Sequence, residues 1–140
     1  MKLVIDRSKW LRGEGSEKSF LLRSTDGKMC CLGFFGLACG LTAERITDVD
    51  APTDIPVEIG VIGVSARRES VEIGISARRE WMRNVPEAEA LFDGERKYNS
   101  SVICNQLMST NDLNVSLSDA EREQKITALF AEMGVEVVFV

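Results

Sequence analysis

The chain of 140 residues contains no histidine. Histidine is the usual base in Ser–His and Cys–His nucleophile activation, so these catalytic arrangements are excluded. An enzyme built on this chain would have to use carboxylates, lysine or tyrosine. The four cysteines also lack the paired C-x-x-C spacing of a structural zinc site. We therefore expect neither a metal ion nor a cofactor.

A hydrophobic run long enough to cross a bilayer is absent as well. The longest apolar stretch, residues 29–41, is interrupted by three glycines and is too short for a membrane-spanning helix. The N-terminus lacks the apolar block and cleavage site of a secretory signal. We expect a cytoplasmic protein without a membrane partner, whose thiols stay reduced. Free and mostly buried thiols are thus predicted at Cys30, Cys31, Cys39 and Cys104.

The net charge of −5 gives no reason to expect nucleic acid as a direct partner. The charge is unevenly distributed, however. Residues 1–30 carry seven basic and four acidic side chains, and the remainder carries ten basic and eighteen acidic ones. Such asymmetry suits docking of oppositely charged faces, in a homo-oligomer or with another protein, although on most domains it is ordinary solvated surface.

Periodicity and turn residues predict an α+β fold in a single domain spanning residues 1–140. Lys2–Ile5 and 135–140 are β-prone and belong to one small mixed sheet. Because an exposed VVFV edge promotes aggregation, we expect the last strand to be central or paired across a subunit boundary. A further strand is expected over 19–23, before a turn. About three or four helices pack against the sheet, within 31–39, 84–91, 100–108 and 118–133.

The middle of the chain contains a tandem duplication at 57–81. VEIGVIGVSARRES is followed at once by VEIGISARREW. Two copies are too few for a solenoid, so a hairpin or two β–turn units is the simpler interpretation. The copies carry the pairs Arg67-Arg68 and Arg78-Arg79, which suit an acidic partner, although each pair is followed by a glutamate that can neutralise it.

The candidates for covalent chemistry are Cys30 and Cys31, which precede an apolar helix. A cysteine at a helix N-terminus can become a thiolate. Free cysteines are also among the most buried residues, and no histidine is present to activate them, so the structural interpretation is favoured. Asp112 is the only other catalytic candidate, and an enzyme is less favoured than a binding protein.

Two polar groups suggest a small-ligand site. Asn111 and Asp112, expected to join two helices, offer side chains that can bind a ribose, an amide or a cation. Trp10 and Arg12, in a glycine-containing basic loop, can place a phosphate beneath an aromatic ring. The alternatives are turn-forming Asn and Asp side chains and an ordinary basic surface loop.

Three stretches together resemble small uncharacterised proteins of tailed bacteriophages. They are WLRGEGSEKSFLLRSTDGKMCCLGFFGLACGLT, SVICNQLMSTND and EREQKITALFAEMGVEVVFV. The shared features are a glycine-containing loop, a Cys-Cys-Leu-Gly segment and a later Asn-Asp near a C-terminal helix. The stretches cover a little over half of the chain and leave out the duplication. The resemblance implies a phage accessory protein in the host bacterial cytoplasm, without catalytic residues to transfer.

Three functional hypotheses follow. The first is non-catalytic binding that inhibits or redirects a host or host-defence macromolecule, with the two arginine pairs as the partner surface. The second is a nucleotide-binding or nucleotide-sequestering protein that uses Trp10, Arg12, Asn111 and Asp112. The third is a cysteine-dependent enzyme that uses Cys30 or Cys31.

Overall fold

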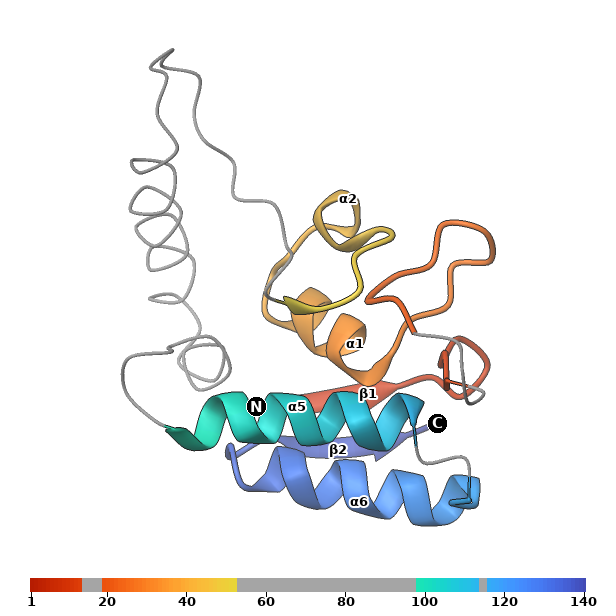
Figure 1. Ribbon diagram of the computed structural model, residues 1–140. Coiled ribbons are helices and arrows are strands. Elements are labelled where there is room, and N and C mark those ends of the chain that lie inside the picture. The colour runs from red at the N-terminus through yellow and green to blue at the C-terminus, as the bar shows by residue number, and fades with distance from the viewer. Residues whose placement is uncertain (14–18, 53–97, 114–115) are drawn as a thin grey trace.

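The computed structural model describes residues 1–13, 19–52, 98–113 and 116–140 (Figure 1). The tandem duplication at 57–81 and the helix expected over 84–91 lie outside these residues. The helices and strands of the described residues are β1 (Lys2–Ile5), α1 (Cys31–Ala38), α2 (Ala43–Ile46), α5 (Tyr98–Asp112), α6 (Asp119–Ala131) and β2 (Glu136–Phe139).

The two terminal strands belong to one sheet, as the sequence predicts, and they pair with each other. Within the described residues β2 is an edge strand instead of a central one. They run parallel, with Lys2 opposite Glu136 and Ile5 opposite Phe139. The β1 residues alternate between exposed and buried, so one face of the pair points inward. An α+β fold is therefore confirmed. The sheet is this parallel pair within the described residues, and its mixed character stays a prediction.

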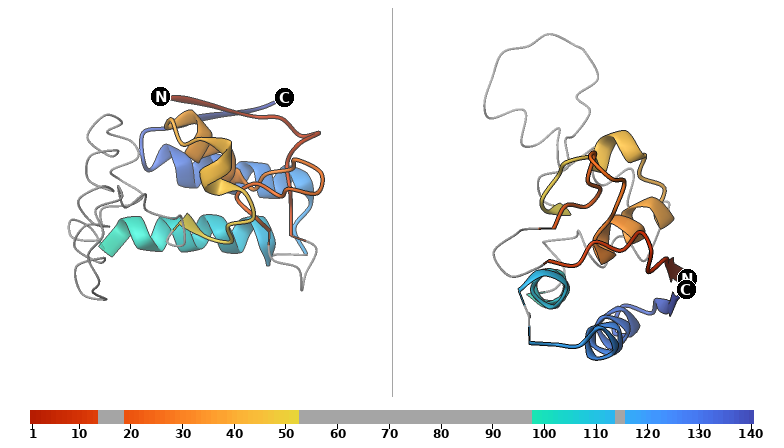
Figure 2. Two further views of the ribbon diagram at one scale, coloured as in Figure 1. Left: turned by 90° about the horizontal axis from the view of Figure 1, so that it is seen from above. Right: turned by 90° about the vertical axis from the view of Figure 1, so that its right-hand side faces the viewer.

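The helices cover one face of the strand pair. Helix α1 packs against β1, and α6 packs against β2, while α5 contacts both α1 and α6. Figure 2 shows the strands on one side of the molecule and the helices beneath them. Because the strands are parallel, the two chain ends lie at opposite ends of the pair (Figure 2, left).

The short apolar helix predicted over 31–39 is confirmed as α1. It follows a turn in which Gly27 has a φ of +70° and ends before Gly40, whose φ is +91°. Its residues from Cys31 to Gly36 are all buried. A helix that is apolar around its whole circumference suits a position in the core.

The two C-terminal helices are also confirmed, with one correction. Helix α5 runs to Asp112, so Asn111 and Asp112 form its last turn instead of joining two helices. Helix α6 starts with the predicted capping box. Ser118 Oγ accepts from the Glu121 N–H at 3.4 Å, and the Glu121 carboxylate accepts from the Ser118 N–H at 2.9 Å.

Removing this cap tests its contribution. Ser118→Ala leaves the Glu121 N–H without its protein acceptor, so we expect the free energy of unfolding to fall by about 1 kcal/mol. Ser116→Ala is the matched control, because Ser116 is exposed and precedes the helix. Urea unfolding followed by circular dichroism measures both changes. Equal effects would show that the capping box contributes nothing specific.

The strand predicted over 19–23 is wrong. Leu22 forms only an isolated parallel bridge with Thr47, and no strand is assigned there. The Leu21 N–H donates to the Val49 C=O at 2.8 Å and the Leu22 N–H to the Ile46 C=O at 3.2 Å. These backbone N–H groups are therefore hydrogen-bonded to the segment around the end of α2. The turn that follows forms as expected, at Gly27.

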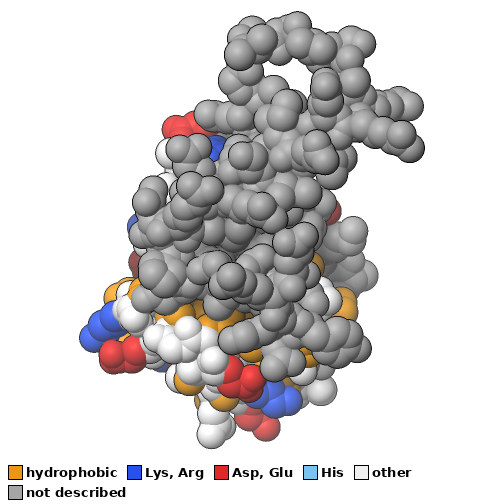
Figure 3. Space-filling view, turned by 90° about the vertical axis from the view of Figure 1, so that its left-hand side faces the viewer, with side chains coloured by type: hydrophobic (Ala, Val, Ile, Leu, Met, Phe, Trp, Pro, Cys, Tyr) orange, Lys and Arg blue, Asp and Glu red, His pale blue; other side chains and the backbone are white. Residues whose placement is uncertain are grey.

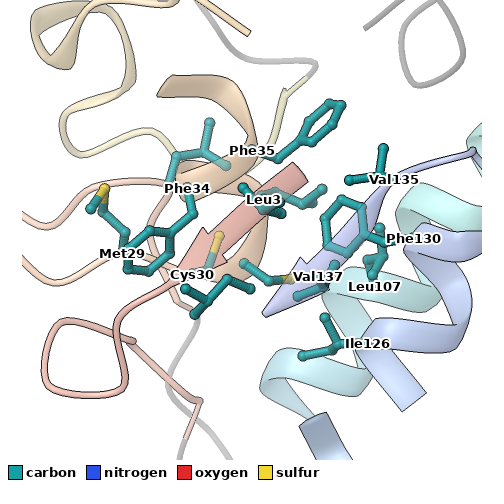
Figure 4. Packing of buried hydrophobic residues seen from close by; sticks show 14 of the residues in the cluster. Leu3, Met29, Cys30, Phe34, Phe35, Leu107, Ile126, Phe130, Val135 and Val137 are labelled. Carbon is teal, nitrogen blue, oxygen red and sulfur yellow. The ribbon is translucent and has the colours of Figure 1, made fainter. Parts of the chain in front are cut away.

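The described residues share one hydrophobic core. Side chains from both strands and from α1, α5 and α6 meet in it, as Figure 4 shows for Leu3, Phe35, Leu107, Phe130 and Val137. The rings of Phe35 and Phe130 lie 5.4 Å apart between centroids, in a tilted arrangement that is favourable for aromatic pairs. The core therefore joins the first forty residues to the last forty.

No helix in the described part of the chain is long and apolar enough to cross a membrane.

Candidate functional site

The structure brings Trp10 and Asn111 together, as the small-ligand hypothesis requires, but it buries both. The indole Nε1 of Trp10 donates to Asn111 Oδ1 at 2.8 Å. The backbone N–H of Cys31, at the start of α1, donates to the same oxygen at 3.4 Å. Trp10 is 2% exposed and Asn111 is 1% exposed. The amide oxygen is therefore used by two internal donors.

The amide nitrogen of Asn111 is used internally as well. Asn111 Nδ2 donates to the Leu11 C=O at 3.0 Å, to Ser19 Oγ at 3.1 Å and to Asp112 Oδ1 at 2.7 Å. An indole N–H can only donate, so the side chain of Asn111 must turn its oxygen toward Trp10 and its nitrogen toward these acceptors. We call Trp10, Ser19, Cys31, Asn111 and Asp112 the Asn111 network.

Asp112 completes the network through Ser19. The Ser19 hydroxyl donates to Asp112 Oδ1, and the Ser19 N–H donates to Asp112 Oδ2 at 3.4 Å. Ser19 is buried and Asp112 is partly buried. Two adjacent residues of α5 thereby hold a loop that lies far away in the sequence.

Two residues of this region, Ser19 and Arg122, escaped the sequence analysis as site residues, whereas Gly13 belongs to the glycine-containing loop that it singled out. The Gly13 N–H donates to the backbone C=O of Asn111 at 3.1 Å, and Arg122 Nη1 donates to the same oxygen. A signal for Arg122 existed. It precedes Ile126 by four residues and therefore lies on the buried face of α6.

Arg12 lies on the outer side of the network. Its guanidinium carbon is 5.1 Å from the centre of the Trp10 ring, within range of a cation–π interaction. Arg12 also forms an ion pair with Asp119, the first residue of α6. Of the four residues in the small-ligand hypothesis, only Arg12 and Asp112 are partly exposed.

The environment of the two adjacent cysteines does not suit a nucleophile. Burial raises the pKa of Cys30 to about 12, and the negative charge of Asp112 acts in the same direction. Burial also raises the pKa of Cys31 well above its ordinary value, with further contributions from Cys30 and Asp112. Although both lie at the N-terminus of α1, desolvation outweighs the helix dipole. Both thiols are neutral at pH 7.

All four cysteines are free thiols, as predicted, and only Cys104 is less than fully buried. Burial raises the pKa of Cys104 to about 11. We expect iodoacetamide at pH 7.5 to label native Cys104 slowly and the other three cysteines hardly at all, because alkylation requires an accessible thiolate. Mass spectrometry over time measures this, with labelling in urea as the control for full reactivity. Rapid native labelling of Cys30 or Cys31 would contradict the buried, neutral state.

Among the residues that the structure describes, no three cysteine, aspartate or glutamate side chains form a group that could hold a metal ion. The arginine pairs at 67–68 and 78–79 lie outside the described residues. No protein-family model matches the chain, and neither a curated protein nor a solved structure matches it.

Proposed function

We propose that this protein acts by non-catalytic binding, as a bacteriophage accessory protein that inhibits or redirects a macromolecule in the host cytoplasm. One observation carries the proposal. Among the candidates for chemistry, Trp10, Asn111 and both adjacent cysteines are buried, and Trp10 and Asn111 are hydrogen-bonded to each other within the Asn111 network. Binding of a macromolecule through the protein surface needs no exposed reactive group, so it fits this arrangement best.

The Asn111 network also gives a structural reason for the resemblance to phage proteins. The glycine-containing loop, the Cys-Cys-Leu-Gly segment and the Asn-Asp pair contact one another through Gly13, Cys31 and Asn111. If the phage proteins carry the same residues, the same internal contacts in a common fold would explain it. The resemblance therefore supports a common fold without requiring a common reaction.

The binding surface that we propose is formed by the two arginine pairs. Figure 3 shows one face of the molecule, on which acidic and basic side chains of the described residues lie side by side. In the sequence, Arg67-Arg68 and Arg78-Arg79 each place two positive charges next to each other. An acidic protein surface is the complementary partner.

Capture from host lysate tests this proposal. The tagged protein should retain a host protein, and replacing Arg67, Arg68, Arg78 and Arg79 by alanine should weaken that retention at least tenfold. A matched comparison uses two double variants. R67A/R68A removes two positive charges from one arginine pair, and the control K9A/K125A removes two from exposed positions of the described part of the chain. If the arginine variants retain the partner as well as the control does, the arginine surface is wrong. If no host protein is retained, binding to a host protein is wrong.

A second candidate, nucleotide binding, is favoured by the partial exposure of Arg12 above the Trp10 ring. A phosphate there would compete with Asp119 for the guanidinium. A thermal-shift panel of nucleotides should then raise the melting temperature, and Asp119→Ala should strengthen the response while Arg12→Ala abolishes it. No shift with any nucleotide would exclude this candidate.

A further inference from the structure

The outer edge of β2 carries backbone groups that point away from β1. The Glu136 N–H donates to the Met1 C=O at 2.9 Å, and the Val140 N–H donates to the Ile5 C=O at 3.0 Å. In a parallel ladder, every second residue of a strand bonds the same neighbour. Val137 and Phe139 therefore direct their N–H and C=O groups to the opposite side. Because the sheet consists of β1 and β2 within the described residues, this side is an open edge there.

Within the part of the chain that the structure describes, this edge lacks the usual protection against pairing. Natural edge strands carry proline, lysine or a bulge, or are covered by other elements. The β2 sequence EVVF contains neither proline nor lysine, and its single charge, on Glu136, lies 3.9 Å from Lys2. Beside the edge, the outer face of the sheet exposes two apolar side chains, Val4 (49% exposed) and Val140 (61% exposed), next to the Lys2–Glu136 pair. An open, apolar edge of this kind is a template for another strand.

We propose that the β2 edge pairs with the β2 edge of a second copy of this chain, antiparallel and around a two-fold axis at Val138. In this register the N–H and C=O of Val137 bond those of the partner's Phe139, and Phe139 bonds the partner's Val137. All the outward-pointing groups of both strands are satisfied. Val138 faces the partner's Val138 in the close, non-hydrogen-bonded position.

A second copy fits this edge because a two-fold contact needs only groups that the chain itself carries. The product is a four-stranded sheet with one antiparallel and two parallel pairings. Two strands of four residues bury much less than the roughly 1,600 Å² of a standard stable interface. The dimer is therefore weak, and its population depends on concentration.

The first experiment combines sedimentation velocity with amide hydrogen exchange of the full chain at several concentrations. The expected result is a monomer–dimer equilibrium in which the amides of Val137 and Phe139 become protected as the dimer forms. The amides of Lys2 and Val4, on the opposite edge of the same sheet, are the internal control and should not change with concentration.

The second experiment uses charge at the two-fold axis. Val138→Lys places two like charges opposite each other and should raise the dimer dissociation constant at least about tenfold. Val4→Lys is the matched control, because Val4 is the β1 residue paired with Val138 but lies away from the axis. Mixing Val138→Lys with Val138→Glu should restore a dimer that contains one copy of each.

Four results would overturn the proposal. A protein that stays monomeric at all concentrations excludes the dimer, and so does protection of Val137 and Phe139 in a monomer. A dimer unaffected by Val138→Lys uses another surface. If the Val137 and Phe139 amides become protected from exchange only when a different protein is bound, the β2 edge pairs with a strand of that protein instead of a second copy.

Discussion

Replacing Asn111 by alanine is expected to lower the free energy of unfolding by about 4 kcal/mol, since it leaves several buried polar groups without partners. The Trp10 indole N–H and the Leu11 C=O lose hydrogen bonds of 2.8 Å and 3.0 Å. The Cys31 N–H loses its acceptor as well. Each buried group left unsatisfied costs about 1–3 kcal/mol. Urea unfolding followed by circular dichroism measures the loss.

Asn105→Ala is the matched control for this prediction. Asn105 lies on the same helix but is exposed. Both variants change asparagine to alanine in α5, so both gain the same helix propensity, about 0.5 kcal/mol. The difference between them isolates the hydrogen bonds of Asn111. If the two variants unfold within about 1 kcal/mol of each other, the Asn111 network does not hold the fold together.

The sequence was sufficient for the elements whose pattern is local. The β-prone run Lys2–Ile5, the turn and Gly40 that bound α1, and the capping box before α6 each depend on a few neighbouring residues. The strand expected over 19–23 does not form because its partner, the segment from Ile46 to Val49, turns at the end of α2, where Asp48 has a φ of +55°, so the pairing stops at one isolated bridge. Composition alone does not reveal this limit on the pairing.

The sequence predicts neither the full set of residues in the candidate site nor their role. It places Trp10 and Asn111 in one hypothetical ligand site, and the structure places them in contact. Sequence alone does not show whether a polar side chain faces a ligand or another part of the chain. Ser19 gave no signal, because a single serine next to a glycine-containing loop is ordinary. Only the fold brings it within 3.1 Å of the Asn111 amide.

The close approach of α1 to the Leu21 backbone makes the fold sensitive to a single added methyl group at Gly33. Gly33→Ala would place its Cβ in steric overlap with the C=O oxygen of Leu21 and 2.6 Å from the Leu21 carbonyl carbon. The Leu21 backbone cannot move aside freely, because its N–H is bonded to Val49 at 2.8 Å and its side chain is 1% exposed. We expect a loss of more than about 3 kcal/mol in the free energy of unfolding, or failure to fold.

Gly36→Ala provides the comparison, because it is the same change one turn later in the same helix. Its Cβ would meet the flexible tip of Leu41 at 3.1 Å and no backbone atom within 4 Å. Alanine is also favoured over glycine in a helix by about 1 kcal/mol, so the net change should stay within about 1 kcal/mol. Thermal unfolding of the two variants measures the difference. Similar stabilities would mean that α1 does not pack directly on the Leu21 backbone, and that the close approach of these two segments is not what fixes the position of Cys31 beside Asn111.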